Sequence, residues 1–178
     1  MTDVPWLSPA EMQAWLRFIA VVQLLPGALE SELQADAGLT HYEYFTLAKL
    51  SEAPERTLRM TALSDATNAT LPRLSHVVRR LEERGLVERF PCADDRRATN
   101  ARLTDAGWEI VVAAAPGHVE TVRKHVFDAL GPDLVGALDE VSTRILRTLD
   151  PSDRLHALTP PGVAEAPSAA TAPTAPAA

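Results

Sequence analysis

The chain has a single cysteine, and this scarcity limits its chemistry. Cys92 is the one thiol among 178 residues, which excludes an intrachain disulfide and a zinc site built from several cysteines. The N-terminus has no basic stretch followed by an apolar one, so no signal peptide is evident. No apolar run is expected to be long enough to span a membrane. We therefore predict a soluble, cytoplasmic protein with one sizeable core.

Groups of residues that carry catalysis are also missing. We find no nucleophile paired with a base, no metal-ligand set and no glycine-rich phosphate loop. His118 and His125 are seven residues apart and would share one helix face, but no Asp, Glu or Cys completes a metal set with them. We expect these histidines at the surface or at a subunit interface. The sequence predicts that the chain is not an enzyme and needs no cofactor.

Positive charge is scarce overall and concentrated in one region. The formal net charge is −7. Residues 56–102 nevertheless hold ten arginines, no lysine and six acids, a local charge of +4, so the rest of the chain carries −11. A basic middle between acidic flanks is compatible with localised phosphate binding.

Residues 70–84 have the pattern of an amphipathic helix. Thr70 is a candidate N-cap, and Gly85 ends the helix. The apolar positions share one face at helical spacing: Leu71, Leu74, Val77, Val78 and Leu81. The other positions hold Arg73, Ser75, His76, Arg79 and Arg80. Such a helix fits the major groove of double-stranded DNA, although a solvated face with Arg79–Glu83 and Arg80–Glu83 pairs is the alternative.

Two short strands are predicted after this helix. Residues 86–90 and 98–103 alternate in polarity, and Asp94-Asp95-Arg96-Arg97 form the tip between them. An arginine-tipped hairpin can reach a minor groove or the phosphates. The alternative is a polar turn without a DNA contact.

Long helices are predicted on both sides of this region. A capping box at Ser8 opens a helix over residues 9–37, which Pro26-Gly27 either kinks or divides in two. Much of its surface is more apolar than a small core requires, and a partner subunit would explain the excess. A helix opened by Thr104 runs past Pro116-Gly117 to a break at Gly131-Pro132, and a last helix covers residues 133–149.

Shorter elements are predicted between the first long helix and residue 70. A capping box at Thr40 opens a helix that ends before Pro54. A short strand over residues 58–60 follows. Thr61 caps a helix over 62–66, and Asn68 adopts the left-handed conformation of a tight turn. The fold class is thus mostly α with a small β-wing: a winged helix-turn-helix lobe flanked by long N- and C-terminal dimerisation helices.

The expected division of the chain follows these elements. Residues 1–7 form a flexible arm, and 8–149 form a single domain. Within it, 8–38 and 104–149 are the dimerisation helices and 40–103 the winged helix-turn-helix lobe. Residues 150–178 are rich in Ala, Pro and Thr, which predicts a disordered tail.

Several motifs in this order resemble the MarR family (multiple antibiotic resistance regulators). They are LTHYEYFTLAKLSEAP, the run RLEERGLVER, the DDRRA wing tip and the LTDAG restart, and the resemblance spans residues 8–149. It implies a homodimer with interlocked terminal helices and two DNA-reading lobes. It also implies a regulator, most simply a repressor at a pseudo-palindromic operator, that a small-molecule or redox signal usually releases.

The resemblance also implies residue roles. Thr70–Arg84 is the recognition helix. Asp95 and Arg97 match the family's wing pair, in which the Arg enters the minor groove and the Asp orients it, and Arg96 faces phosphate. Leu71-Pro72 departs from the small polar or basic residues common there, so base readout shifts to Arg73 and beyond. The DNA-binding set is Thr70, Arg73, Ser75, His76, Arg79, Arg80, Asp95, Arg96 and Arg97.

Trp15 is the leading ligand candidate, because some family members bind aromatic acids beside a Trp on the first helix. A small aromatic, phenolic or anionic ligand would lie among Trp15, Phe18, His41 and Tyr44. The alternative is that Trp15 and Phe18 belong to a dimer core. Cys92 is interpreted as an incidental thiol and not a redox sensor.

Two hypotheses for function remain from the sequence. The first is a ligand-responsive, homodimeric DNA-binding regulator. The second is a winged-helix protein-interaction module that binds no DNA, which the acidic total charge and Leu71-Pro72 motivate.

Overall fold

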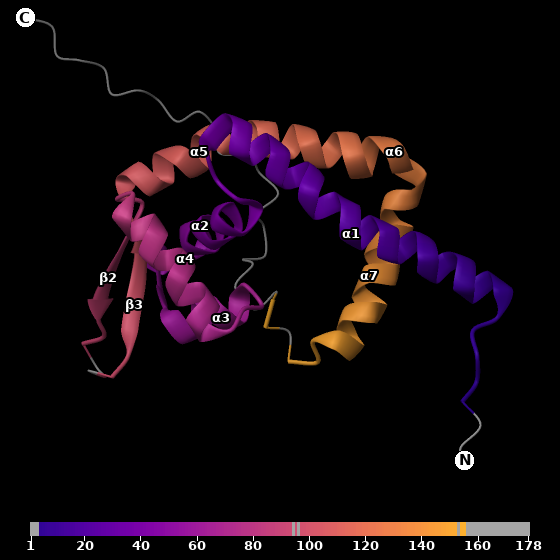
Figure 1. The fold of residues 1–178 in the computed structure, drawn as a ribbon, viewed down its shortest axis with the longest axis horizontal. Helices are drawn as coiled ribbons and strands as arrows, with labels where there is room; N and C mark the ends of the chain where they lie inside the picture. Colours follow the sequence, from indigo (N-terminus) through magenta and orange to yellow (C-terminus); the bar gives the residue numbers. More distant parts are fainter. Residues whose placement is uncertain (1–3, 94, 96, 153, 156–178) are drawn as a thin grey trace, which may run out of the picture.

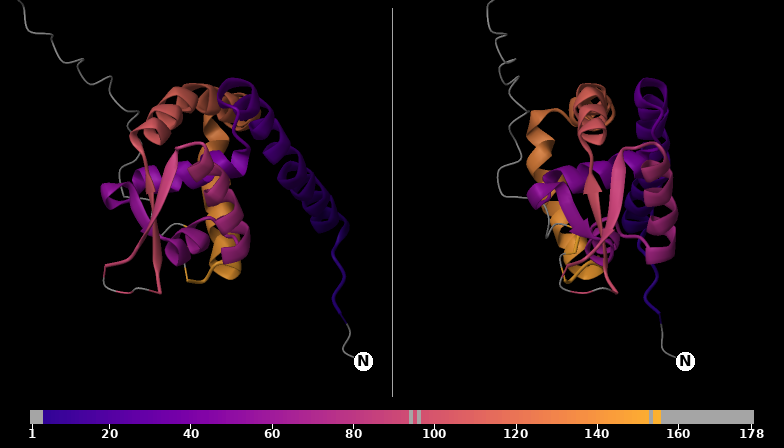
Figure 2. Two further views of the ribbon diagram at one scale, coloured as in Figure 1. Left: turned by 60° about the vertical axis from the view of Figure 1, so that its left-hand side comes forward. Right: turned by 90° about the vertical axis from the view of Figure 1, so that its left-hand side faces the viewer.

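The computed structural model describes residues 4–93, 95, 97–152 and 154–155. Helix α1 lies alongside α5, a lobe of shorter elements lies to one side of them, and the N-terminal half of α1 projects away from that lobe (Figure 1). The hairpin of the lobe points away from α5 (Figure 2). The fold is mostly helical with one small antiparallel sheet, as predicted.

The elements follow one another in this order. They are α1 (Pro9–Ala37), α2 (His41–Glu52), the 3₁₀ turn η1 (Pro54–Arg56), β1 (Thr57–Arg59), α3 (Met60–Ala66), α4 (Leu71–Glu83), β2 (Val87–Pro91), β3 (Thr99–Leu103), α5 (Asp105–Val122), the π-helical turn η2 (Arg123–Phe127), α6 (Asp128–Leu130), the 3₁₀ turn η3 (Pro132–Leu134) and α7 (Val135–Leu149).

Helix α1 is one continuous helix, which decides between the two alternatives at Pro26. Its start is the predicted capping box: the Ser8 hydroxyl accepts from the Glu11 amide, and the Glu11 carboxylate accepts from the Ser8 amide. Gly38, with a φ of 61°, ends the helix in the left-handed conformation. Arg84, which follows α4, donates from Nη1 to the Gly38 carbonyl over 3.1 Å and so ties this end of α1 to α4.

Of the N-caps predicted for α2, α3 and α4, one is confirmed in full. Thr40 makes the predicted capping box with Glu43. Thr61 is not a cap, because α3 already begins at Met60. Thr70 occupies the N-cap position of α4, but its side chain makes no capping hydrogen bond. Pro72 stands in the second helical position without an N–H, so one of the two amides that such a cap uses is missing.

The wing is part of a three-stranded sheet in the order β1-β3-β2. The predicted hairpin is confirmed, with Val87 opposite Leu103 and Pro91 opposite Thr99. The short strand predicted over 58–60 is shifted by one residue, and it joins the hairpin through β3. The wing therefore has one more strand than the two predicted.

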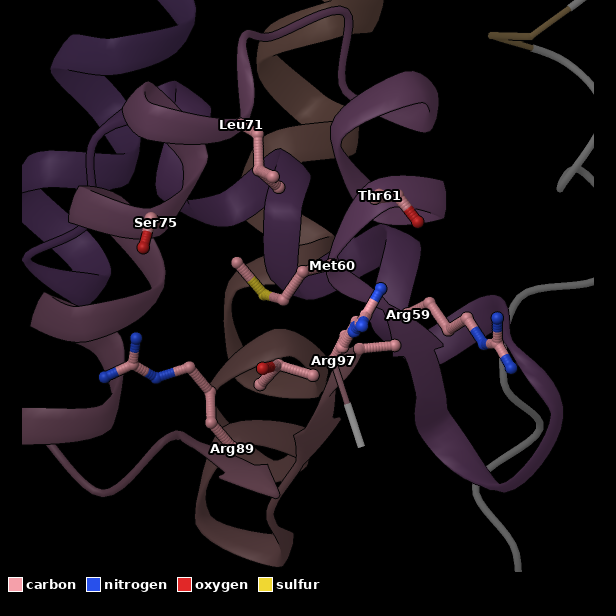
Figure 3. A pocket seen from close by; sticks show the side chains of 9 residues that line it. Arg59, Met60, Thr61, Leu71, Ser75, Arg89 and Arg97 are labelled. Atoms are coloured by element: carbon pink, nitrogen blue, oxygen red, sulfur yellow. The ribbon is translucent and has the colours of Figure 1, made fainter. Parts of the chain in front are cut away.

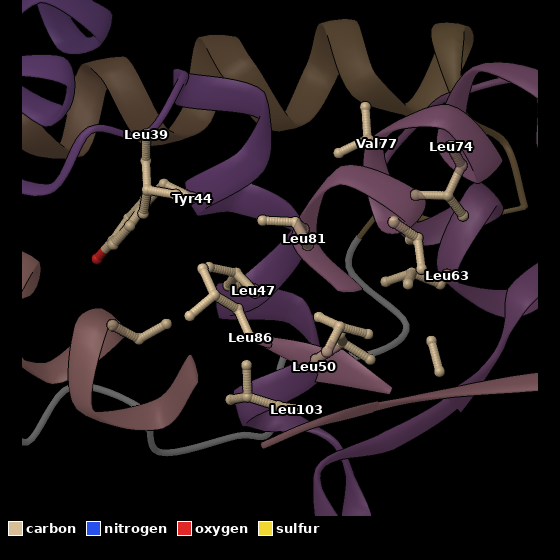
Figure 4. Close-up of a cluster of buried hydrophobic side chains, with 14 of the residues drawn as sticks. Leu39, Tyr44, Leu47, Leu50, Leu63, Leu74, Val77, Leu81, Leu86 and Leu103 are labelled. Atoms are coloured by element: carbon tan, nitrogen blue, oxygen red, sulfur yellow. The ribbon is translucent and has the colours of Figure 1, made fainter. Parts of the chain in front are cut away.

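A cluster of buried leucines and valines holds the lobe together (Figure 4). From α4 it takes Leu74, Val77, Val78 and Leu81, as the helical spacing predicts. Leu71 was expected on the same face, but its side chain is 43% exposed, so that prediction is wrong. Leu71 is the first residue of α4 and lies on the side of the helix toward the wing.

The start of α5 is pressed against the end of the α4–β2 connection. Thr104 donates its amide to the Leu86 carbonyl over 3.1 Å and its hydroxyl to the Gly85 carbonyl over 2.7 Å. The same hydroxyl caps α5 by accepting from the Gly107 amide, as predicted. Gly107 allows this approach, because a Cβ there would lie 2.2 Å from the Leu86 carbonyl oxygen.

Large apolar side chains are exposed mainly on the long helices. Those of α1 are Met12, Trp15, Leu16, Phe18, Val21, Val22 and Leu24, and those of α7 are Val135, Leu138, Val141 and Leu149. Among the described residues of the lobe, 40–103, Leu71 is the one exposed large apolar side chain. The excess of apolar surface predicted for residues 9–37 is present.

By length and composition, α1 could also cross a membrane, and only 6% of its most apolar window is buried. This corrects the expectation that no apolar run is long enough, since Arg17 is the one charged residue between Met12 and Leu29. Length and composition do not distinguish a membrane helix from a helix that packs against another protein chain.

Candidate nucleic-acid interface

The exposed surface of α4 has an outer face and two flanks. With about 100° of rotation per residue, Pro72, His76 and Arg79 lie opposite the buried side. Leu71 and Ser75 lie on the flank toward the wing, where they line a common cavity. The other flank, toward α2, is described separately below because its arginines have partners there.

Arg79 is the central cation of the outer face. Its Nη2 lies 3.2 Å from Nδ1 of His76, and its Nε lies 3.9 Å from Oε1 of Glu83. The side chains of Arg79 and Glu83 are 56% and 68% exposed. An ion pair this exposed is weak, so it competes poorly with a nucleic-acid ligand for the guanidinium.

The flank toward α2 holds two arginines that already have partners. The Arg73 guanidinium lies 4.9 Å from the centre of the Tyr42 ring. Arg80 Nη2 lies 3.1 Å from Oε1 of Glu43, whose side chain is only 8% exposed. The alternative interpretation of this helix expected Arg80 to pair with Glu83. Arg80 instead pairs with Glu43 of α2. Tyr42 and Glu43 therefore hold these two cations on the flank of α4 that faces α2.

A cavity of about 200 Å³ separates α4 from the wing. Figure 3 shows its lining side chains. They are Arg59, Met60, Thr61, Leu71, Ser75, Arg89, Arg97, Ala98 and Thr99. Arg89 is held by Glu82, with 2.9 Å from Nε to Oε2, and these hydrogen bonds lower the pKa of Glu82. Arg59 donates from Nη2 to the Cys92 sulfur over 3.4 Å.

At the wing tip, Asp95 orders the turn. Its Oδ1 accepts from the Arg97 backbone amide over 3.0 Å, and its carbonyl accepts from the Ala98 amide over 2.9 Å. The resemblance implied that Asp95 orients the Arg97 side chain, whereas the hydrogen bond observed goes to the Arg97 backbone. Asp94 and Arg96 lie outside the described residues.

The structure brings some of the predicted DNA-binding residues together and separates others: Arg73 and Arg80 contact α2, and Arg96 lies outside the described residues. Ser75 and Arg97 line one cavity, and His76 and Arg79 are in contact. Sequence reasoning missed Tyr42 and Arg59. Tyr42 comes two residues after the Thr40 cap, and no local pattern shows that it faces Arg73, which is 31 positions away.

Comparison with known proteins agrees with this geometry. The MarR family pattern matches residues 39–99. Sco3205 of Streptomyces coelicolor, a MarR family transcriptional regulator solved in complex with DNA, is 42% identical with a TM-score of 0.81, and the match covers 86% of this chain and 96% of Sco3205. The chain belongs to the MarR family.

A second MarR relative is AbsC of Streptomyces coelicolor. It is 39% identical with a TM-score of 0.77, over 82% of this chain and 98% of AbsC. Escherichia coli MarR, solved with operator DNA, matches at 23% identity with a TM-score of 0.68, over 76% of this chain and 96% of that one, and shows the shared fold. This chain is therefore a DNA-binding transcriptional regulator with a winged helix, and its relatives are regulators and not enzymes.

In this MarR protein the four predicted ligand residues fall into two groups. Trp15 and Phe18 are neighbours on α1, with ring centres 6.4 Å apart, and both are exposed. His41 and Tyr44 instead contact His118 of α5, at 6.3 and 4.7 Å. Glu30, whose charge acts on His41, is twelve residues beyond Phe18, or about 18 Å along the helix. Within one chain the four residues do not surround a single ligand.

A buried polar cluster lies where α1, α2 and α5 meet. Both carboxylate oxygens of Glu32 and Nδ1 of His118 are buried without a hydrogen-bond partner. Gly117 leaves room for the acids, since a Cβ there would lie 2.6 Å from Oε1 of Glu32 and 2.9 Å from Oδ2 of Asp36. Burial, and then the neighbouring Asp36, raises the pKa of Glu32. Within the described ranges no group of three or more His, Cys, Asp or Glu residues could hold a metal ion.

The His118→Gln variant is expected to lose less stability than the wild type on acidification. Burial, and then His41, lowers the pKa of His118, so its contribution is present above the ordinary histidine pKa and is lost as the pH falls through the lowered value. Glu32 and Asp36 of α1 and His41 and Tyr44 of α2 remain unchanged in the variant. Melting temperatures at pH 7.5 and pH 5 measure the difference.

The matched control for this prediction is His125→Gln, at an exposed position on η2. It should keep the wild-type response to pH. An equal fall in melting temperature for His118→Gln and the wild type would contradict the assignment of this response to the buried cluster.

Proposed function

We propose that this MarR protein is a homodimeric, cytoplasmic repressor that binds a pseudo-palindromic operator and is released by a small aromatic ligand. One observation carries the proposal: a lobe with an exposed arginine and histidine face on α4, beside a wing, is attached to long helices with large exposed apolar faces. The first surface suits DNA, and the second suits a copy of the same chain.

The proposed DNA contacts divide by position. His76 and Arg79 on the outer face, with Ser75 and Arg73 beside them, face the major groove. Arg97 enters the adjacent minor groove, where a narrow groove attracts arginine. Thr70, Arg80 and Arg96 contact phosphates, and Asp95 shapes the wing turn.

The proposed dimer would cover the apolar side chains of α1 and α7. A two-fold axis lets one self-complementary surface satisfy both copies, so the same residues are buried twice. Trp15 and Phe18 belong to this surface, which favours the dimer core over a ligand role for them. Two lobes held in this way would place their recognition helices about 34 Å apart, one turn of DNA.

The proposed ligand would bind at the polar cluster formed by Glu32, His118, His41 and Tyr44. A phenolic hydroxyl would donate a hydrogen bond to the buried Glu32 carboxylate, and its ring would pack on Tyr44. Binding would release DNA by favouring a lobe spacing that no longer matches two successive grooves. The alternative of a protein-interaction module without DNA binding loses its support, because this chain belongs to a DNA-binding family.

The proposal is tested by gel shifts on the DNA upstream of the chain's own gene, together with sedimentation of the free protein. The wild type should sediment as a dimer and bind with strong salt dependence, weakening on the order of a thousandfold between 50 and 200 mM salt. Phe18→Asp should sediment as a monomer and bind that DNA far more weakly, since only one half-site is engaged at a time.

Gln13→Asp is the matched control, because it adds the same charge to an exposed position of the same helix, off the apolar stripe. It should remain dimeric. A monomeric wild type, or a Phe18→Asp variant that is still dimeric and binds normally, would overturn the proposed dimer.

A further inference from the structure

Leu71 is exceptional among the apolar residues of the lobe. Every other apolar side chain of α4 apart from Pro72 is buried, whereas Leu71 is 43% exposed. A single exposed leucine is ordinary on a protein surface. The position of this leucine is unusual, because Leu71 is the first residue of α4. The N-terminal residues of a recognition helix are those that meet base edges in the major groove.

The first two residues of α4 offer few hydrogen-bond donors. Pro72 has no amide hydrogen, and Leu71 has no polar side-chain atom. The Thr70 hydroxyl makes no capping bond, and the Arg73 guanidinium lies over the Tyr42 ring on the opposite flank. Any sequence reading at Leu71 must therefore depend on apolar contact and not on hydrogen bonds.

Only one base presents an apolar group at the major-groove edge. Thymine carries a C5-methyl there, whereas adenine, guanine and cytosine present only donors and acceptors. We propose that Leu71 is a specificity-determining residue that selects a thymine in each half-site by contact with this methyl group. The inference rests on the proposed DNA-binding role of α4.

The side chains around Leu71 suit a thymine methyl group, because an apolar side chain lies beside Leu71 and polar side chains lie next to both. Leu71 points toward the buried Met60, so a methyl group against it would meet side chains on more than one side (Figure 3). Ser75, one turn further along the same flank, and Arg97 line the same cavity. Their hydroxyl and guanidinium groups would bond to base edges or phosphates next to the thymine.

The test replaces thymine with uracil, which removes the methyl group and keeps base pairing. The probe is a duplex that the wild-type protein itself enriches from a randomised pool. Each thymine is replaced in turn, symmetrically in both half-sites, and affinity is measured by titration. At one position we expect the wild type to weaken about fourfold per half-site, the factor that corresponds to burial of one methyl-sized group.

Variants then assign the methyl contact to one side chain. Leu71→Ala should bind the thymine and uracil duplexes equally, whereas Leu71→Met should keep the preference for thymine. The circular dichroism and melting temperature of each variant show that the fold is retained, since residue 71 is outside the core.

Two results would overturn the assignment. One is a wild type that is insensitive to uracil at every position, and the other is a uracil effect of the same size in Leu71→Ala. Failure of the wild type to enrich any sequence would instead contradict the proposed function itself, so the two failures are distinguishable.

Discussion

The Gly107→Ala variant is expected to lose about 3 kcal/mol of unfolding free energy, the upper end of what overpacking usually costs. A Cβ at residue 107 would lie 2.2 Å from the Leu86 carbonyl oxygen and 2.6 Å from Cδ1 of Leu103. The leucine side chain can rotate away, but the Leu86 carbonyl is held by the Thr104 amide. Relief therefore requires α5 to shift relative to the lobe. Urea denaturation at constant protein concentration measures the loss.

Gly136→Ala is the matched control. Gly136 lies inside α7, and a Cβ there would have nothing within 4 Å. Alanine is a better helix former than glycine by about 1 kcal/mol, so this variant should be at least as stable as the wild type. If both variants unfolded at the same urea concentration, the close approach at Gly107 would not be the cause.

The Arg79→Ala variant is expected to weaken DNA binding by about 1–3 kcal/mol for each subunit, or roughly tenfold to more than a hundredfold in affinity. Arg79 is the cation at the centre of the outer face of α4, and its ion pair with Glu83 is long and exposed. It is therefore ready to exchange that partner for a base edge or a phosphate. A gel-shift titration on the duplex enriched by the wild type measures the effect.

Arg144→Ala is the control for the charge removed. Arg144 pairs with Glu140 on an exposed face of α7, with the same four-residue spacing as Arg79 and Glu83 but with the acid first. Its loss should leave DNA affinity within about twofold, since a single distant charge acts only through a screened field. Repeating the Arg79→Ala titration over a salt series separates base from phosphate contact, because loss of a phosphate contact lowers the salt slope by about one. Equal effects of the two variants would contradict a DNA contact by Arg79.

The elements that sequence reasoning predicted well are those that local chemistry determines. Both capping boxes and the left-handed residue Asn68 depend on a few consecutive residues, and all are present. The errors involve longer range. Thr61 is a good cap in isolation, but β1 pairs with β3 and ends at Arg59, so α3 begins two residues earlier than predicted. Leu71 fits the apolar period of α4, but it is the first residue of that helix, and it lines an open cavity beside the wing instead of packing in the core.

The candidate site shows the same division. Spacing alone placed Ser75, His76 and Arg79 on the exposed surface of α4. It did not show that Glu43 pairs with Arg80, because the two residues come from different helices and Glu43 was already explained by its capping role. The four ligand candidates share an aromatic character, but the sequence does not show how far apart they lie. Trp15 and Phe18 are on the N-terminal half of α1, whereas His41 and Tyr44 lie near its other end. Arg96 lies outside the described residues, so its role stays a prediction.

The join at Thr104 has a mechanical consequence. β3 ends at Leu103 and α5 begins at Asp105, so one residue links the hairpin to a long helix, and that residue is bonded to the end of the α4–β2 connection. Arg84 bonds the end of α4 to the end of α1. The wing and the recognition helix are therefore both bonded to the long helices, so a rotation of α5 is expected to turn them together. In the proposed regulation, a ligand would end DNA binding by rotating the lobe as one body, and the hydrogen bonds within the lobe would not have to break.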